Sequence, residues 1–204
     1  PLIRRKTRQS LEELKNTGHE IIELDMPVLK YALAAYYVIV PAEIASNLSR
    51  HDGVRYGFRS EKSSTRPELY KNTRNERFMP ENKRRIMIGN CVLSSGFYDA
   101  YYLKAQQVRQ KICAEYEGIL NECDAILLPI APSVAPKFGA SHSPLEMYLS
   151  DIYTIGVNLA GLPALCMPVD KDENGLSIGM QLIGAKFKEQ IILNAAYGLE
   201  KALA

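Results

Sequence analysis

The spacing of apolar positions changes twice within the first quarter of the chain. Residues 4–17 combine apolar positions at helical spacing with many charges, which predicts an exposed amphipathic helix ended by Gly18. Residues 19–24 alternate between polar and apolar and predict a short strand. Residues 30–40 are apolar on nearly every side, so we expect a buried helix, which Pro41 kinks or restarts. The first helix and strand, in this order, are typical of the second half of an α/β crossover.

The middle of the chain is more polar and less regular. Residues 51–80 contain several glycines and prolines and predict an irregular region. A helical rhythm returns from Pro80 to Gly96, and Pro80 suits the first turn of a helix. Residues 98–121 then predict a long helix.

The C-terminal part of the chain predicts a small sheet and further helices. Residues 164–169 and 177–183 are apolar segments joined by a polar turn, which predicts an antiparallel pair. The other expected elements are a strand at 124–129, an ordered proline-rich loop at 130–145, a short helix at 151–159 and a final helix at 188–203. The whole pattern predicts the α/β fold class.

Composition excludes several kinds of protein. The 204 residues are 47% hydrophobic with a net charge of +2, which is ordinary for a globular domain. Four cysteines without a CxxC pair and three scattered histidines indicate neither a disulfide framework nor a zinc site. Reduced thiols fit the cytoplasm or an organelle matrix. We find no apolar run of about 18 residues and no signal-peptide pattern, so we expect no membrane contact.

Two serine pairs are candidates for a nucleophile. Ser94-Ser95-Gly96 lies where the helix starting at Pro80 should end, whereas a nucleophile elbow needs a strand followed by a turn into a helix. We therefore interpret it as a helix terminus, with Gly96 in the left-handed conformation. Ser63-Ser64 adjoins Lys62, but nothing around it would depress the pKa of a lysine. A Ser-His-Asp set with His142 is formally possible, although composition cannot assemble one.

Several longer strings resemble one known family. The strings "KYALAAYYVIVPAEIASNLSRHDGVRYGFRS" and "RRIMIGNCVLSSGFYDAYYLKAQQVR" resemble the A subunits of glutamyl-tRNA(Gln) amidotransferases, which belong to the amidase signature family. The strings "MYLSDIYTIGVNLAGLPALCMPV" and "GLSIGMQLIG" are shared more widely among amidases. The resemblance implies the C-terminal part of an α/β/α fold with a mixed sheet over residues 1–204. The family's Gly/Ser-rich signature, with its nucleophile serine, bridging serine and lysine, is not among these residues.

The resemblance also implies a role in binding glutamine. By motif, Tyr36 would line the pocket, Arg85 would pair with the α-carboxylate, and Asp151 would accept the α-ammonium. A guanidinium forks onto a carboxylate and a carboxylate accepts from an ammonium, so these residue types suit a zwitterion. No catalytic residue and no metal ligand is implied in this chain.

The residues by themselves leave other interpretations open. Arg85 lies four positions after Glu81, a spacing typical of an ion pair on a helix surface, and Arg84 could be the ligand instead. Asp151 follows a serine at a helix start, where a carboxylate favours the helix dipole. Tyr36 could be a core residue, with Tyr37 in the pocket.

The resemblance further implies an assembly. The complete A subunit would hydrolyse glutamine, and ammonia would pass to a B subunit that amidates glutamyl-tRNA with ATP and magnesium, while a small C subunit bridges the two. This chain alone should be inactive, should need no cofactor and should meet tRNA only through the complex. Residues 59–85 hold nine Lys/Arg and four Glu, but without an aromatic stacking pattern they favour a solvated or partner-facing surface over RNA binding. The alternatives are another amidase signature hydrolase or a non-catalytic scaffold or binding module.

Overall fold

The computed structural model describes residues 2–139 and 144–203, which form two compact units. Unit 1 contains the chain up to Leu33 and from Arg109 onward, and unit 2 contains Ala34–Val108. The boundaries fall within the helices α2 (Ala32–Leu48) and α5 (Lys104–Leu120).

Unit 1 is built on a three-stranded antiparallel sheet. The strands β1 (Ile126–Pro129), β2 (Ala164–Lys171) and β3 (Ser177–Ile183) lie in the order β1-β3-β2. Ile183 of β3 pairs with the first residue of each neighbour, Ile126 on one side and Ala164 on the other. The predicted antiparallel pair is therefore confirmed, as is the α/β fold class. The resemblance implies a mixed sheet, whereas both strand pairs among the described residues are antiparallel.

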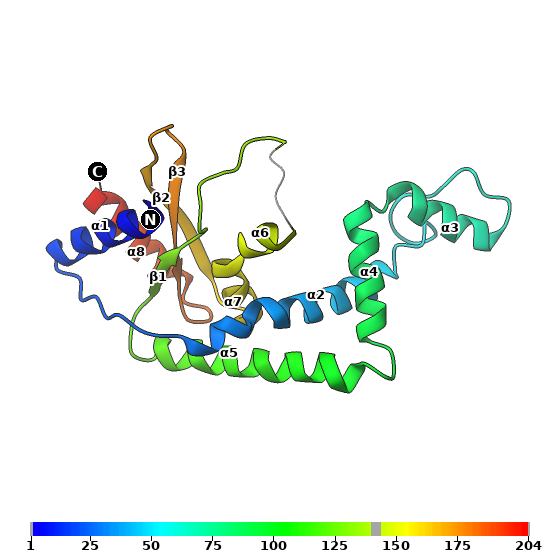
Figure 1. Ribbon diagram of the computed structural model, residues 1–204, viewed down its shortest axis with the longest axis horizontal. Helices are drawn as coiled ribbons and strands as arrows, with labels where there is room; N and C mark the ends of the chain where they lie inside the picture. The colour runs from blue at the N-terminus through cyan, green and yellow to red at the C-terminus, as the bar shows by residue number, and fades with distance from the viewer. Residues whose placement is uncertain (1, 140–143, 204) are drawn as a thin grey trace. The chain divides into compact units, whose positions relative to one another are not determined.

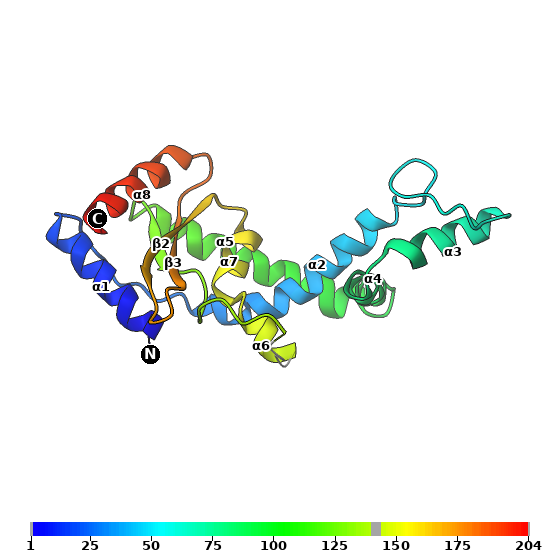
Figure 2. The ribbon, with the colours of Figure 1, turned by 90° about the horizontal axis from the view of Figure 1, so that it is seen from above.

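Helices cover both faces of this sheet. Figure 2 shows α1 (Leu2–Asn16) and α8 (Glu189–Leu203) on one face, and α7 (Ile152–Ala160) with the second half of α5 on the other. On the first face, Leu182 of β3 packs with Ile192 and Ala196 of α8 in a buried apolar cluster. On the second face, Gly156 of α7 approaches Tyr116 of α5 so closely that a Cβ at Gly156 would lie 2.9 Å from the tyrosine hydroxyl. The layers match the α/β/α arrangement that the resemblance implies.

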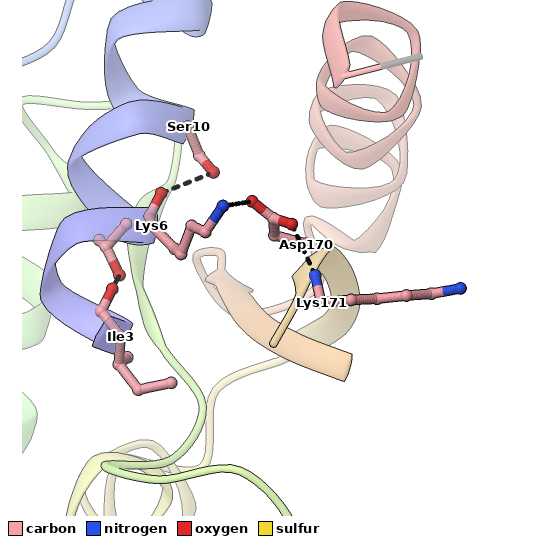
Figure 3. A network of polar contacts seen from close by, with 6 residues as sticks. Ile3, Lys6, Ser10, Asp170 and Lys171 are labelled. Atoms are coloured by element: carbon pink, nitrogen blue, oxygen red, sulfur yellow. Dashed lines mark hydrogen bonds and ion pairs between the residues drawn. The ribbon is translucent and has the colours of Figure 1, made fainter. Parts of the chain in front are cut away.

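A polar contact joins the first helix to β2. The Lys6 ammonium lies 2.6 Å from Oδ2 of Asp170, whose Oδ1 accepts a hydrogen bond from the Lys171 amide (Figure 3). The sheet register shifts between Pro168 and Asp170, so the carboxylate stands at a bulge. The Lys6 hydrogen bond, followed by that of the Lys171 amide, lowers the pKa of Asp170 below its usual value.

The structure corrects the strand expected at residues 19–24. This segment is irregular, and Ile22 and Leu24 are exposed. Within the described part of the chain no strand pairs with it, because β1 and β2 each pair only with β3. Alternation is a weak signal where no neighbouring strand supplies hydrogen bonds.

Unit 2 is helical, and two of its elements differ from the prediction. The helix α2 continues through Pro41, which is fully buried, instead of kinking or restarting there. Residues 51–80 are not irregular throughout, because α3 (Arg66–Arg77) lies within them. Thr65 and Glu68 form a complete capping box at the start of α3, a pattern readable in the sequence as Thr-x-x-Glu.

The rest of unit 2 follows the predicted order (Figure 1). The helix α4 (Pro80–Val92) begins at the expected proline. The long helix expected at 98–121 starts as a π-helical turn, η2 (Tyr98–Leu103), and continues as α5.

Two further segments add to the predicted pattern. The helix α6 (Pro144–Leu149) falls within the segment expected to be a loop. The stretch Pro27–Leu48, in which a short 3₁₀ turn η1 (Pro27–Tyr31) precedes α2, is long and apolar enough to cross a membrane. Core helices of soluble proteins also pass that test, so the stretch is weak evidence of a membrane span.

Candidate functional site

The serine pair after α4 forms a junction between helices. The hydroxyl of Ser94 donates to the Cys91 carbonyl at 2.7 Å, and the Ser94 carbonyl accepts from the amides of Phe97 and Tyr98. The predicted helix terminus is confirmed, but Gly96 is not among the glycines with a positive φ, so its expected left-handed conformation is wrong. The turn is closed by the Ser94 hydroxyl instead.

The second serine pair belongs to the start of α3. The Ser64 hydroxyl donates to Oε2 of Glu68 at 3.0 Å, and Ser63 accepts from the Asn72 amide at 3.4 Å. The backbone amide of Ser64, and then its hydroxyl, lower the pKa of Glu68. These serines therefore stabilise the start of a helix, in line with the non-catalytic interpretation of the sequence. His142 lies outside the described residues.

Arg85 and Arg84 share one carboxylate on α4. Arg85 donates from Nε to Oε1 of Glu81 at 3.1 Å, and Arg84 donates from Nη1 to Oε2 at 2.8 Å. The ion pair expected from the spacing of Glu81 and Arg85 is therefore present. The side chain of Arg85 is 29% exposed, whereas that of Arg84 is 59% exposed. Arg85 is thus the more enclosed of the two candidate ligands.

Tyr36 and Tyr37 act electrostatically on the Arg85 guanidinium. Burial acts to lower the pKa of Arg85, but the Glu81 hydrogen bond and the fields of Tyr36, Glu81 and Tyr37 outweigh it and raise the pKa. The two tyrosine rings meet edge to face with centroids 5.3 Å apart. Unit 2 therefore brings together Arg85 and both tyrosines that the sequence left as alternatives.

Asp151 stands at the start of α7 in unit 1. Its carbonyl accepts the first two amide bonds of that helix, from Thr154 and Ile155, each at 3.0 Å. The position at a helix start that the sequence indicates is therefore confirmed. The side chain makes no capping bond, and among the described residues Oδ1 accepts a 3.4 Å hydrogen bond from the Ser150 hydroxyl. The residue is exposed, so its carboxylate is open to an external donor.

Unit 1 also contains a cavity. It measures about 230 Å³ and lies between the second half of α5, the end of α7 and the segment leading to α8, with Glu117 and Lys186 among its lining. None of Tyr36, Arg85 and Asp151 lines it. In the described part of the chain no group of three or more His, Cys, Asp or Glu side chains could hold a metal ion.

Comparison with known proteins places the chain in a family. The model of the family described as Amidase matches residues 1–193. The chain belongs to the amidase family. The A subunit of the glutamyl-tRNA(Gln) amidotransferase of Helicobacter hepaticus is 66% identical over 203 residues, covering 100% of this chain and 45% of the relative. The subunit of the same name from Campylobacter fetus is 58% identical, covering 94% of this chain and 42% of the relative.

Solved structures agree with this family assignment. The crystal structure of the glutamyl-tRNA(Gln) amidotransferase A subunit from Thermotoga maritima is 37% identical, with a TM-score of 0.68, over 93% of this chain and 36% of that chain. A structure described as an amidase has a TM-score of 0.73 at 24% identity, and this likeness concerns the fold alone. The chain thus spans less than half the length of the relatives it matches.

Proposed function

We propose that this chain is the C-terminal portion of the A subunit of a tRNA-dependent amidotransferase. The relatives that it resembles carry that name, and their similarity extends over nearly all of this chain. We further propose that the chain supplies the contacts to the α-carboxylate and α-ammonium of glutamine. The observation that carries this proposal is the Arg85 guanidinium, which is partly enclosed and is tethered by Glu81 through Nε, while its terminal nitrogens make no hydrogen bond within the described residues.

The geometry of Arg85 suits a carboxylate ligand. Glu81 occupies Nε, and within the described part of the chain the two terminal nitrogens of Arg85 make no hydrogen bond. Those two nitrogens form the end of the guanidinium fork that accepts a carboxylate with two parallel bonds. Glu81 carries one negative charge between Arg84 and Arg85, so this cluster keeps one net positive charge for the substrate.

Asp151 would serve the opposite end of the substrate. Its carboxylate is exposed and makes no bond to the helix amides, so it is free to accept from an α-ammonium. Contacts at both charged groups would fix the orientation of the substrate's side-chain amide for attack. The attacking serine, the bridging serine and the lysine would come from the part of the subunit outside this chain.

The remaining steps would belong to the assembly. The complete A subunit would release ammonia from glutamine through a serine acyl-enzyme, and a B subunit would use ATP and magnesium to amidate glutamyl-tRNA(Gln) with it. A small C subunit would bridge the two, in the cytoplasm or an organelle matrix. This chain by itself would bind glutamine weakly at most and would not hydrolyse it, so sustained ammonia release by the isolated chain would contradict the proposal.

The test is a matched pair of substitutions in the complete A subunit within its complex. Arg85→Gln should raise the glutamine KM about 100-fold, because a two-bonded charged contact is lost. Arg84→Gln removes the same type of charge from the same helix and should change KM less than about threefold. Equal effects of the two substitutions would reject Arg85 as the carboxylate ligand. Amidation supported by added ammonium should be unchanged in both, because it bypasses glutamine.

A further inference from the structure

Gln181 is a fully buried polar residue in the middle of the unit 1 sheet. It belongs to β3, the central strand, and is 0% exposed. Its side-chain amide donates to the Tyr153 carbonyl of α7 at 2.8 Å and to the Pro129 carbonyl of β1 at 3.4 Å. One side chain therefore links the central strand to the end of a neighbouring strand and to a helix on one face of the sheet.

Packing alone does not account for a glutamine at this position. Among the described residues, Oε1 of Gln181 has no hydrogen-bond partner although it is buried. A buried amide oxygen left without a partner costs stability, and an apolar side chain of the same length would avoid that cost. The presence of an amide is therefore explained by the two hydrogen bonds that its nitrogen donates.

The stronger of its two bonds fixes the first turn of α7. Tyr153 is the second residue of that helix and follows Asp151 by two positions. The Asp151 carbonyl accepts the first helix amides, whereas its side chain makes no cap and, among the described residues, accepts a 3.4 Å bond from the neighbouring Ser150 hydroxyl. The position of the Asp151 carboxylate thus depends on where the first turn stands against the sheet.

We propose that Gln181 is a positioning residue for substrate binding, which places the Asp151 carboxylate by holding the first turn of α7 at the Tyr153 carbonyl. This inference rests on the proposed function, because it requires Asp151 to receive the α-ammonium of glutamine. Displacement of a binding group by about 1 Å weakens a charged contact and disturbs substrate orientation. Gln181 touches no substrate and acts through α7.

The experiment uses Gln181→Met in the complete amidotransferase. Methionine has similar length and no donor, and it removes the unpaired Oε1, so unfolding stability should change little. The glutamine KM should rise about tenfold while kcat stays within about twofold, because binding is weakened and the attacking groups lie elsewhere. Gln190→Met is the control, since Gln190 is an exposed glutamine on α8 whose amide donates to Asn194 of the same helix. Gln181→Leu repeats the test with a branched side chain should the methionine variant not assemble.

A double substitution separates this inference from the proposed function. Asp151→Asn alone should raise the glutamine KM, and adding Gln181→Met to it should raise KM no further, because both act at one contact. An unchanged KM in Gln181→Met, or an equal increase in both backgrounds, would overturn the positioning role and leave the proposed function standing. An unchanged KM in Asp151→Asn would remove the ammonium contact itself, and the inference with it. Ammonium-supported amidation should be normal in every variant.

Discussion

Lys6 and Asp170 tie the first helix of the chain to the bulge in β2 (Figure 3). The folded-state pKa of Asp170 is below the usual 3.8, so this contact stabilises the fold fully above about pH 4 and is lost as the pH falls through the lowered value. Lys6→Met should therefore reduce hydrogen-exchange protection of α1 about twofold at pH 7 in the complete subunit, and the difference from the parent should shrink as the pH falls below 3.8.

The control for this prediction lies on the same helix. Lys15 is paired with Glu12 at 3.7 Å, and both side chains are at least half exposed. Lys15→Met should leave protection of α1 unchanged both at pH 7 and at acidic pH, since exposed pairs contribute little. A loss in Lys15→Met as large as that in Lys6→Met would show that helix charge, and not the Asp170 contact, controls α1.

The residues of the candidate site were predictable to different degrees. The Glu81–Arg85 pair follows from helix spacing alone, because residues four apart are neighbours on a helix surface. The placement of Tyr36 relative to Arg85 depends on the packing of α2 against α4, which periodicity does not specify. Gln181 was missed although its signal was visible, since one amide side chain stands among the apolar residues of the strand 177–183.

At the scale of elements, the crossing of α2 and α4 depends on one glycine. A Cβ at Gly89 of α4 would collide with the backbone carbonyl group of Pro41 in α2 and lie 2.8 Å from Cβ of Ala45. Backbone atoms cannot give way as a flexible side chain can. These two helices also carry Tyr36 and Arg85, so the crossing sets the spacing of the candidate site.

Gly89→Ala should therefore destabilise unit 2 and disturb the site. We expect a loss of about 1–3 kcal/mol in the free energy of unfolding of the complete subunit, from overpacking. The glutamine KM should rise as well, because α4 must move away from α2. The control is Gly118→Ala in α5, where a Cβ meets nothing within 4 Å, and it should be neutral or stabilising by up to about 1 kcal/mol. Urea denaturation measures the free energy of unfolding of each variant, and equal values for Gly89→Ala and Gly118→Ala would contradict the prediction.

The same contact explains why α2 departs from the sequence prediction. Proline inside a helix loses one amide donor, so a kink or restart was expected at Pro41. Its complete burial and its close approach to Gly89 offset that cost within unit 2. For α3 the information was local and could have been used, because Thr65 and Glu68 form a recognisable cap. For residues 19–24 the local sequence does not contain the deciding information, since strand formation depends on whether another strand lies alongside.

At the scale of the whole molecule, the sheet of unit 1 has two outer strands and exposed apolar side chains on one of them. The strands β1 and β2 are the outer strands of the sheet, and each pairs along one edge only within the described residues. Ala164, Cys166 and Pro168 of β2 are exposed. The chain covers 45% of its Helicobacter hepaticus relative, so more than half of such a subunit lies outside it. Unpaired edges beside exposed apolar surface favour association between chains.

The isolated chain should therefore self-associate under reducing conditions and bind the dye ANS, whereas a complete subunit should do neither. Sedimentation velocity measures the association, and Cys166→Lys should reduce it because a charge on an edge strand opposes strand pairing. Asn194→Lys adds the same charge at an exposed position of α8, away from the sheet edge, and should leave association unchanged. A monomeric chain without dye binding would favour the stand-alone scaffold that the sequence left as an alternative. Equal effects of the two lysines would place the association elsewhere than at β2.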